Sequence, residues 1–275
     1  MFGTALLFGV LTGIFLAIGF LLGGIGGMGI ALVLAIVINF ISYWYSDKIV
    51  LGLYRAKPSH DKKLNDTVAK LSREAKIPAP KVYVVPNREP NAFATGRNAR
   101  HAALAVTEGL TGLNEGEMEG VLSHEIGHIS NHDILVSTVA ATLAGAISYI
   151  AQIGYFSLYG GASEDRGAGS IIGIILIVIF APLAALMIRM AISRSREYKA
   201  DRYGALLTKN PEGLASALRK IDSIAKQHPM QGGSSATSNM WIVNPFHGNW
   251  FTNLFSTHPP IEQRIRRLVA MENKD

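Results

Sequence analysis

Two histidines four residues apart enclose a glutamate in the stretch 121–128, Val-Leu-Ser-His-Glu-Ile-Gly-His. On a helix, the imidazoles of His124 and His128 would project from one face and could share a metal ion. Glu125 would lie beside the ion, where a carboxylate can take a proton from a water that the metal activates. These residue types and this spacing predict the metal-binding helix of a hydrolase. The plainer interpretation is two histidines packed in a protein core.

A catalytic zinc site with three protein ligands needs one more side chain than these two histidines. His132 is a poor candidate, because a further helical turn of about 5.4 Å carries its side chain beyond the ion. We therefore expect His132 to cap the helix or to lie at the surface. A third histidine ten residues after the first, the arrangement of another class of zinc proteases, is excluded because position 134 is Ile134.

Glu197 is the better third ligand, since it begins a polar stretch that follows a long apolar segment. Asp201 lies four residues later, on the same face of a predicted helix. Its carboxylate could accept a hydrogen bond from the outer nitrogen of a ligating histidine and hold the ring in position. The alternative is that Glu197 pairs with Arg194 or Arg196, as surface charges commonly do. The two-histidine motif favours the ligand role.

The composition of the chain predicts a membrane protein. Hydrophobic residues make up 49% and charged residues 17% of the 275 residues, whereas soluble domains carry about 25% charged residues. No charged residue precedes Asp47, and few lie between 134 and 188. A helix needs roughly 20 apolar residues to cross a bilayer, so four spans are expected at about 4–22, 29–44, 135–155 and 170–188. A cleaved signal peptide is not expected, because no Lys or Arg precedes the first apolar run.

The basic residues predict which side of the membrane the polar segments face. All but one of the 26 Lys and Arg residues lie in 47–133 and 189–275, and basic residues gather on the cytoplasmic side of short-looped membrane proteins. Both segments are therefore expected in the cytosol, and the loops 23–28 and 156–169 outside. The four expected parts are a transmembrane hairpin 1–46, a catalytic segment 47–133 with the metal-binding helix, a second transmembrane hairpin 134–188, and a catalytic segment 189–275 with the third ligand.

The first cytosolic segment predicts a small sheet ahead of the metal-binding helix. A helix is expected at 60–74 from the spacing of its apolar residues. Extended pieces are expected at 81–85, 91–96 and 102–107. Asn114, three residues before Glu117, has the pattern of a helix N-terminal cap. The expected fold class is an α-helical membrane protein with about four transmembrane helices and a mainly α cytosolic catalytic domain, of α+β type with a small β-sheet.

Charge and cysteine content exclude several function classes. The net charge is +6, but the basic residues are dispersed and no nucleic-acid motif is present, so attraction to anionic lipid headgroups explains the charge more simply. A solvated helix face is expected for the basic cluster Arg264, Arg266 and Arg267. The chain has no cysteine, which excludes disulfides, thiol catalysis and cysteine-ligated zinc.

Four stretches together resemble the HtpX family of integral-membrane zinc metalloproteases, gluzincins related to the CAAX prenyl proteases. They are Asn-Ala-Phe-Ala-Thr-Gly at 91–96, His-Glu-Ile-Gly-His at 124–128, Glu-Tyr-Lys-Ala-Asp at 197–201 and Ser-Thr-His-Pro-Pro at 256–260. The order of features also agrees, with two spans before the metal-binding helix and two between that helix and Glu197. This order is more specific than the five-residue motif, and the resemblance covers nearly the whole chain. It implies a zincin-like catalytic domain.

The resemblance implies a cytosol-facing endopeptidase with one Zn²⁺ per chain, held by His124, His128 and Glu197. Glu125 would take the proton of the water and pass it to the leaving amine, while Asp201 would orient a ligating histidine.

An edge strand is further expected to receive an extended substrate through backbone hydrogen bonds, with contacts from Asn91, Ala92, Phe93 and Ala94. His258 could donate a hydrogen bond to the oxyanion of the tetrahedral intermediate. Plainer interpretations stay open: Asn91 as a turn residue after Pro90, and His258 as a loop residue before two prolines.

The resemblance also implies a setting: a multi-pass protein of the cell inner membrane that cleaves membrane or unfolded proteins in stress-related quality control. Its partners would be these substrates and the lipid bilayer, without nucleic acid, and a homo-oligomer stays open. The alternatives are a CAAX-type prenyl-protein protease, a non-proteolytic zinc-binding assembly factor and, last, a transporter. The long loop 232–253, rich in Gly, Ser and aromatic residues, is expected to be either a flap beside the cleft or a core-packed loop.

Overall fold

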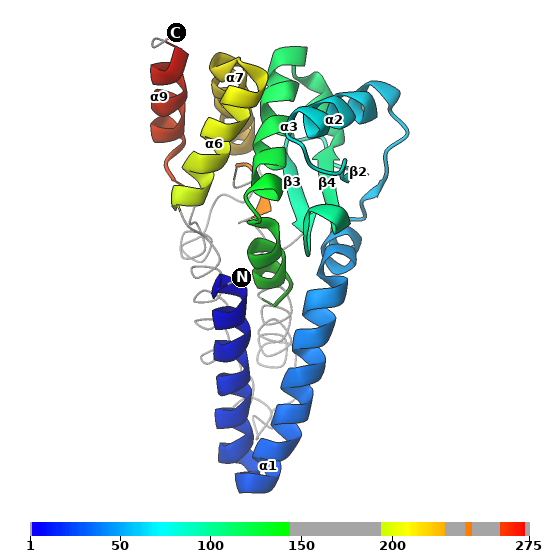
Figure 1. Cartoon of the computed structure of the whole chain (residues 1–275), viewed down its shortest axis with the longest axis vertical. Helices are drawn as coiled ribbons and strands as arrows, with labels where there is room; N and C mark the ends of the chain where they lie inside the picture. The colour runs from blue at the N-terminus through cyan, green and yellow to red at the C-terminus, as the bar shows by residue number, and fades with distance from the viewer. Residues whose placement is uncertain (1, 144–193, 229–239, 244–258, 273–275) are drawn as a thin grey trace, which may run out of the picture.

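The computed structural model describes residues 2–143, 194–228, 240–243 and 259–272. An apolar helical hairpin forms one end of the molecule, and a mixed helix and sheet domain forms the other (Figure 1). The predicted span 170–188, most of the predicted span 135–155, the loop 156–169 and His258 lie outside the described residues.

The hairpin is α1 (Phe2–Leu53), in which two helical arms meet at Gly23 and Gly24. Gly24 has a φ of +58°, a conformation that glycine adopts without steric cost. The second arm, Gly23–Leu53, has 31 residues and is long and apolar enough to cross a membrane; the first contains the shorter apolar helix Ala5–Phe20. The predicted break was too wide, since the helix resumes directly after Gly24 instead of at residue 29.

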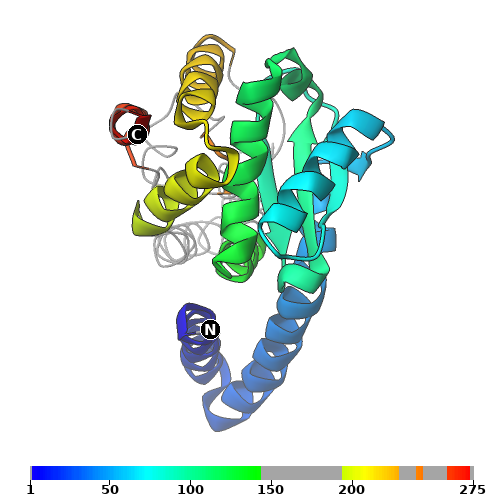
Figure 2. The ribbon, with the colours of Figure 1, turned by 45° about the horizontal axis from the view of Figure 1, so that its top comes forward.

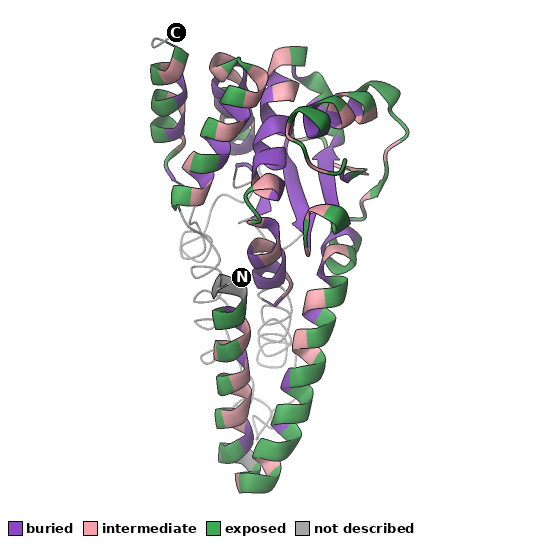
Figure 3. Cartoon of the chain, viewed as in Figure 1, coloured by how far each residue is buried: buried purple, intermediate pink, exposed green. Residues whose placement is uncertain are grey.

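The two arms of the hairpin pack closely at Gly19 and Gly27. A Cβ on Gly19 would lie 2.6 Å from the carbonyl oxygen of Gly27, so the two backbones touch at a distance that only glycine allows. Further along, the Asn39 side-chain amide donates to the Thr12 hydroxyl across 3.0 Å. The outward face of the hairpin exposes large apolar side chains, among them Ile30, Val33 and Phe40, as expected for a surface in lipid (Figure 3).

The sheet has four strands, in the order β1-β2-β4-β3. They are β1 (Lys57–Pro58), β2 (Lys81–Val85), β3 (Ala92–Gly96) and β4 (Ala102–Thr107). β2 runs parallel to β4, and β3 runs antiparallel to β4. The three predicted extended pieces are therefore confirmed as β2, β3 and β4. β3 is an edge strand, and the short helix η1 (Ala99–His101) lies in the turn after it.

The central helix α3 (Glu115–Ser130) starts at the predicted cap, where the Asn114 and Glu117 side chains each bond the other's backbone amide. On one side of α3 lie the sheet and α2 (Lys62–Glu74). On the other side lie α6 (Arg194–Thr208) and α7 (Pro211–Gln227) (Figure 2). The helix α9 (Ile261–Glu272) packs on α6 and α7. The short helix η2 (Glu108–Gly112) precedes α3. Apolar residues of α3, the sheet, α7 and α9 form one core, which includes Leu104, Leu122, Leu218 and Leu268.

The other face of the sheet packs against the end of α1 and the segment 240–243. Tyr54, Phe93 and Trp241 form an aromatic cluster there, with ring centroids 4.7–5.6 Å apart. The Trp241 indole also donates to the Tyr54 hydroxyl across 3.0 Å. The sheet is thus covered on both faces, and β3 lies between the central helix and this cluster.

Candidate active site

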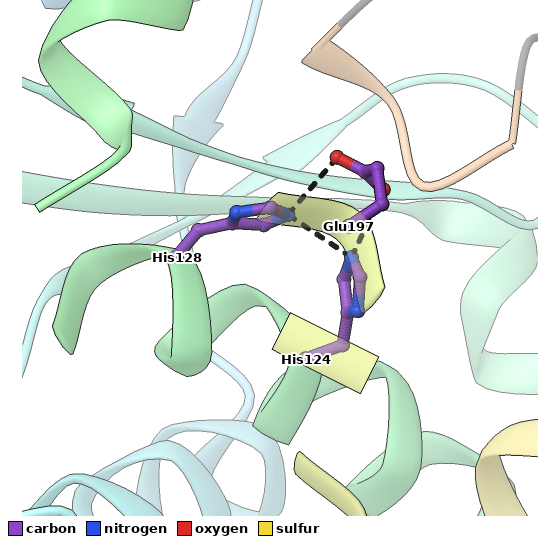
Figure 4. Close-up of side chains that lie close together, drawn as sticks. All are labelled: His124, His128 and Glu197. Carbon is purple, nitrogen blue, oxygen red and sulfur yellow. Dashed lines mark hydrogen bonds and ion pairs between the residues drawn. The ribbon is translucent and has the colours of Figure 1, made fainter. Parts of the chain in front are cut away.

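His124 and His128 lie on one face of α3, as their spacing predicts, and their Nε2 atoms are 3.1 Å apart (Figure 4). Glu197, in the first turn of α6, brings its carboxylate to both rings. Its oxygens lie 3.7 Å from Nε2 of His124 and 3.5 Å from Nε2 of His128. The prediction that α6 supplies the third member of this group agrees with the geometry.

The three side chains fit a metal ion of zinc's size. One ligand atom from each can be chosen so that all lie within 4.8 Å of one another. Zinc bonds of about 2.0–2.2 Å in a tetrahedral arrangement would place ligand atoms roughly 3.3 Å apart, close to the separations of 3.1, 3.5 and 3.7 Å found here. Two imidazoles and one carboxylate also form a donor set that zinc accepts. In the part of the chain that the structure describes, no other group of this kind is found.

Close backbone contact between α3 and α6 sets the position of Glu197. A Cβ on Gly204 would lie 2.8 Å from Oγ of Ser123 and 2.9 Å from the backbone nitrogen of His124. On α3, a Cβ on Gly127 would lie 3.3 Å from the backbone of Ala200. Small residues on both helices thus let the axes approach closely, and the carboxylate of Glu197 reaches the histidines.

Each histidine has a carboxylate behind it. Oδ1 of Asp201 lies 2.9 Å from Nδ1 of His124, in the orienting position expected for it. Oδ2 of Asp133 lies 3.6 Å from Nδ1 of His128. Sequence reasoning missed Asp133, which comes directly after the exposed His132. A φ of +60° at His132 turns the chain there, so that the Asp133 amide donates to the His128 carbonyl across 3.0 Å.

Arg264 was predicted on a solvated helix face, and this prediction is wrong. Its side chain is 0% exposed, whereas Arg266 and Arg267 are exposed as expected. α9 turns its buried face, which also carries Leu268 four residues on, toward α6 and α7. The guanidinium forms two hydrogen bonds with the Asp201 carboxylate, at 2.8 and 2.7 Å. The one signal in the sequence is the spacing of Arg264 four residues before the apolar Leu268, which places both on one helix face.

Burial and neighbouring charges separate the pKa values of the two histidines. Burial, aided by the charge of Arg264, lowers the pKa of His124 to about 4 against the opposing effect of Asp201. Burial would also lower the pKa of His128, but the charge of Glu197 and the nearby carboxylates of Asp133 and Glu125 outweigh it and raise this pKa to about 9. Without metal, a proton therefore resides on His128 at neutral pH and not on His124.

The carboxyl groups are shifted in opposite directions. Burial raises the pKa of Glu125 to about 7; the charge of His128 and a backbone hydrogen bond from Ala94 oppose this shift, and Glu197 adds to it. Burial would likewise raise the pKa of Asp201, but Arg264 lowers it to about 2. Glu125 can thus gain and lose a proton near neutral pH, whereas Asp201 remains an anion.

A small cavity of about 20 Å³ opens beside these groups, and its lining includes the histidines, Glu125, Ala94 and the segment 240–242. Residues 240–243 are buried, which for these four residues agrees with a core-packed loop and not with a flap. The rest of the loop 232–253 lies outside the described residues.

The predicted substrate strand is partly engaged by the protein's own chain. The Ile242 amide donates to the Ala92 carbonyl across 3.1 Å, and the Asn91 side-chain amide donates to the Val243 carbonyl across 2.8 Å. Phe93 packs in the aromatic cluster with Trp241. Ala94 lines the cavity.

A helix with two histidines and an adjacent buried glutamate, faced by a carboxylate from a second helix, defines a hydrolase site for a single metal ion. Comparisons with known proteins agree with this class. Residues 58–272 match peptidase family M48. A protein named protease HtpX homolog from Pyrococcus furiosus is 51% identical, with 98% of this chain and 96% of that protein covered. The HtpX homolog from Syntrophobacter fumaroxidans is 49% identical, with 98% and 99% covered.

The chain therefore belongs to the HtpX proteases of peptidase family M48, and it is a membrane metalloprotease. The crystal structure of S. mikatae Ste24p shares the fold, with a TM-score of 0.51 and 20% identity over 94% of this chain. This chain spans 62% of the length of Ste24p.

Proposed function

We propose that the protein is a zinc-dependent endopeptidase that hydrolyses peptide bonds in membrane or unfolded proteins, with Glu125 as general base. The observation that carries the proposal is the group formed by His124, His128 and Glu197, together with the buried Glu125 at the same cavity. When bound there, zinc would supply the Lewis acidity that activates a water and polarises the scissile carbonyl.

The side chains around this site would divide the remaining work. Glu125 is buried at the same cavity, where it would accept a proton from water and return it to the leaving amine. Asp201 accepts from Nδ1 of His124, which leaves Nε2 of that ring as the lone-pair donor. Asp133 lies at the equivalent nitrogen of His128. His258 is proposed as an oxyanion donor on the resemblance to HtpX alone.

Substrate would bind in an extended form at the edge of β3. In an antiparallel strand, alternate residues turn their amide and carbonyl groups to the same side. The Ala92 carbonyl accepts from the Ile242 amide, so the backbone groups of Ala92 point away from β4. The backbone groups of Ala94 therefore point to the same side. The Gly96 amide, next on this side, donates to the Thr138 hydroxyl across 3.2 Å. The Ala94 amide already bonds Glu125, so we propose that the Ala94 carbonyl is the main pairing point for substrate, while Asn91, Ala92 and Phe93 support it.

The setting is part of the proposal. The catalytic domain would face the cytoplasm, because nearly all basic residues lie in the segments that form it. The protein would be multi-pass in the cell inner membrane, act in envelope quality control and contact the bilayer through the α1 hairpin. A CAAX-type prenyl-protein protease is the alternative within the same chemistry.

The test compares the detergent-purified protein with Glu125→Gln, and with Glu119→Gln as a control on the same helix. Each is stripped with chelator and resupplied with zinc, and metal content and casein digestion are measured together. We expect about one zinc per chain in all three, and at least a roughly 100-fold loss of cleavage in Glu125→Gln alone. Normal cleavage by Glu125→Gln would contradict the assignment of the base. Cleavage of a prenylated peptide but not of casein would favour the alternative.

A further inference from the structure

We infer that Arg264 is a positioning residue, which fixes the metal ligand His124 through Asp201 and ties the cavity wall 240–243 to the metal site. The inference rests on the proposed zinc site. It concerns a side chain on α9, a helix that contributes no ligand to that site.

Arg264 holds the Asp201 carboxylate at two points. Nε of Arg264 donates to Oδ2 of Asp201 across 2.8 Å, and Nη2 donates to Oδ1 across 2.7 Å. This two-point contact fixes the plane of the carboxylate. Oδ1 also lies 2.9 Å from Nδ1 of His124. The orientation of the His124 ring therefore depends on a carboxylate whose own orientation Arg264 sets.

The Arg264 guanidinium also contacts the segment 240–243. Nη1 donates to the carbonyl oxygen of Ile242 across 2.8 Å. The Ile242 amide in turn donates to the Ala92 carbonyl on β3, and Ile242 lines the cavity. One planar group thus connects the orienting carboxylate of His124 with the wall beside the predicted substrate strand.

The contacts at position 264 favour an arginine over a lysine or an aliphatic residue. A lysine could satisfy Asp201 or the Ile242 carbonyl as a point charge, but it has no planar fork to satisfy both with two bonds to the carboxylate. A buried guanidinium is costly to desolvate. If apolar packing were the only requirement at this point of α9, an aliphatic side chain would fill it without that cost. The full set of contacts accounts for an arginine.

The experiment uses the full-length, detergent-purified protein as Arg264→Lys and Arg264→Gln. Arg266→Lys, at an exposed position of the same helix, is the matched control. Zinc affinity is measured by competition with a chelator, and the thermal midpoint is measured with and without zinc. We expect both Arg264 variants to bind zinc roughly 10–100-fold more weakly, and Arg266→Lys to match wild type. The stabilisation that zinc confers should shrink with the affinity.

A purely structural role would give a different result. It would lower the thermal midpoint equally with and without zinc and leave zinc affinity within about twofold of wild type, and this outcome would overturn the inference. Failure of both variants to fold while Arg266→Lys folds would also overturn it, because Arg264 would then serve the fold.

Kinetic measurements separate the effect of Arg264 on the metal site from its effect on the cavity wall. At saturating zinc, we expect a severalfold higher KM for an unfolded substrate in Arg264→Lys, since the wall is held less firmly. Wild-type protein that binds no zinc would instead contradict the proposed function itself, and zinc-bound wild type with unchanged Arg264 variants would contradict only this inference.

Discussion

The side chains of Glu197, Glu125 and Asp133 surround His128 and raise its pKa to about 9 against the effect of burial. In the metal-free protein this imidazolium is stabilised by its neighbours, because its pKa is above the ordinary value of 6.5. That stabilisation is complete below about pH 6.5 and is lost as the pH rises through about 9. The metal-free site therefore holds a proton that a metal ion must displace.

Zinc uptake should consequently depend on pH. We expect the zinc affinity of the stripped protein to rise about tenfold per pH unit up to about pH 9 and then to level off, because binding displaces the proton of His128. Isothermal titration calorimetry in buffers of different ionisation enthalpy would count the released protons. An affinity that stays constant between pH 7 and 9 would contradict the assignment of this proton.

Asp133 should matter for metal binding as well. Its carboxylate lies 3.6 Å from Nδ1 of His128, and Arg196 lies 3.5 Å from its other oxygen. In Asp133→Asn the charge that supports His128 is removed, so we expect about tenfold weaker zinc binding and a lower pKa of His128. Chelator competition measures the affinity. The control is Asp66→Asn, which removes an exposed carboxylate paired with Lys62 and should leave zinc affinity unchanged. If Asp133→Asn binds zinc as tightly as wild type, Asp133 serves only the end of α3 and not the metal site.

The site residues that could be predicted from the sequence are placed by local helical spacing. The others are placed by packing between elements or by an unusual backbone conformation. His124, Glu125 and His128 follow from helical spacing alone, and Asp201 follows from its distance to Glu197 along a helix. Arg264 depends on how α9 packs against the rest of the domain, and Asp133 on a positive φ at the preceding residue. The positive φ leaves no pattern in a single sequence, and the spacing of Arg264 from Leu268 shows only a shared helix face, not the contact with Asp201.

At the scale of elements, the site exists because α3 and α6 approach closely. The helix α2, the strands β2, β3 and β4 and the start of α3 were predicted, since caps and apolar periodicity are local. The helix α7 and the short strand β1 were not predicted. The contact between α3 and α6 was not predicted. It depends on Gly127 and Gly204, where an added Cβ would meet the backbone of Ala200 and of His124. The extent of the α1 break was also missed, since the helix resumes directly after Gly24 and Gly27 packs on Gly19.

Gly204→Ala should therefore weaken both the fold and the site. Its Cβ would lie 2.8 Å from Oγ of Ser123 and 2.9 Å from the backbone nitrogen of His124, so α6 must move away from α3. We expect about 1–3 kcal/mol of lost stability and weaker zinc binding, because Glu197 moves with α6. Thermal unfolding and chelator competition measure these effects. Gly112→Ala is the control, since nothing lies within 4 Å of a Cβ at that position; similar behaviour of the two variants would contradict the role of the close contact.

In the whole molecule, the metal site lies at the end of the domain that faces the hairpin. The C-terminal end of α3 and the N-terminal end of α6, which carry the ligands, both point toward α1 (Figure 1). β3 runs in the same direction. At its end Arg97 lies over the ring of Trp44, 4.9 Å from the ring centroid. Trp44 and Tyr45 are exposed aromatic residues near the end of the apolar arm, a position typical of the membrane interface.

This arrangement predicts where along a membrane-bound substrate the cuts fall. Ala94, on β3, lies three residues before Arg97, which follows the strand, or roughly 10 Å away at about 3.3 Å per residue. If Arg97 marks the interface, an extended substrate emerging from the bilayer would reach Ala94 within a few residues. We therefore expect cleavage within roughly ten residues of the membrane in a single-span protein with a long unfolded cytosolic tail.

The measurement uses proteoliposomes that contain the protein and this tailed substrate, with the cut sites mapped by mass spectrometry. The same tail without its span, digested in detergent, is the control, and its cuts should be spread along its length because nothing holds one part of it near the site. A cluster of membrane-proximal cuts only in the tethered substrate would mean that the bilayer sets the register between substrate and β3. Cuts spread evenly along the tethered tail would show that the substrate reaches Ala94 from solution, and Arg97 over Trp44 would then not fix the height of the site above the membrane.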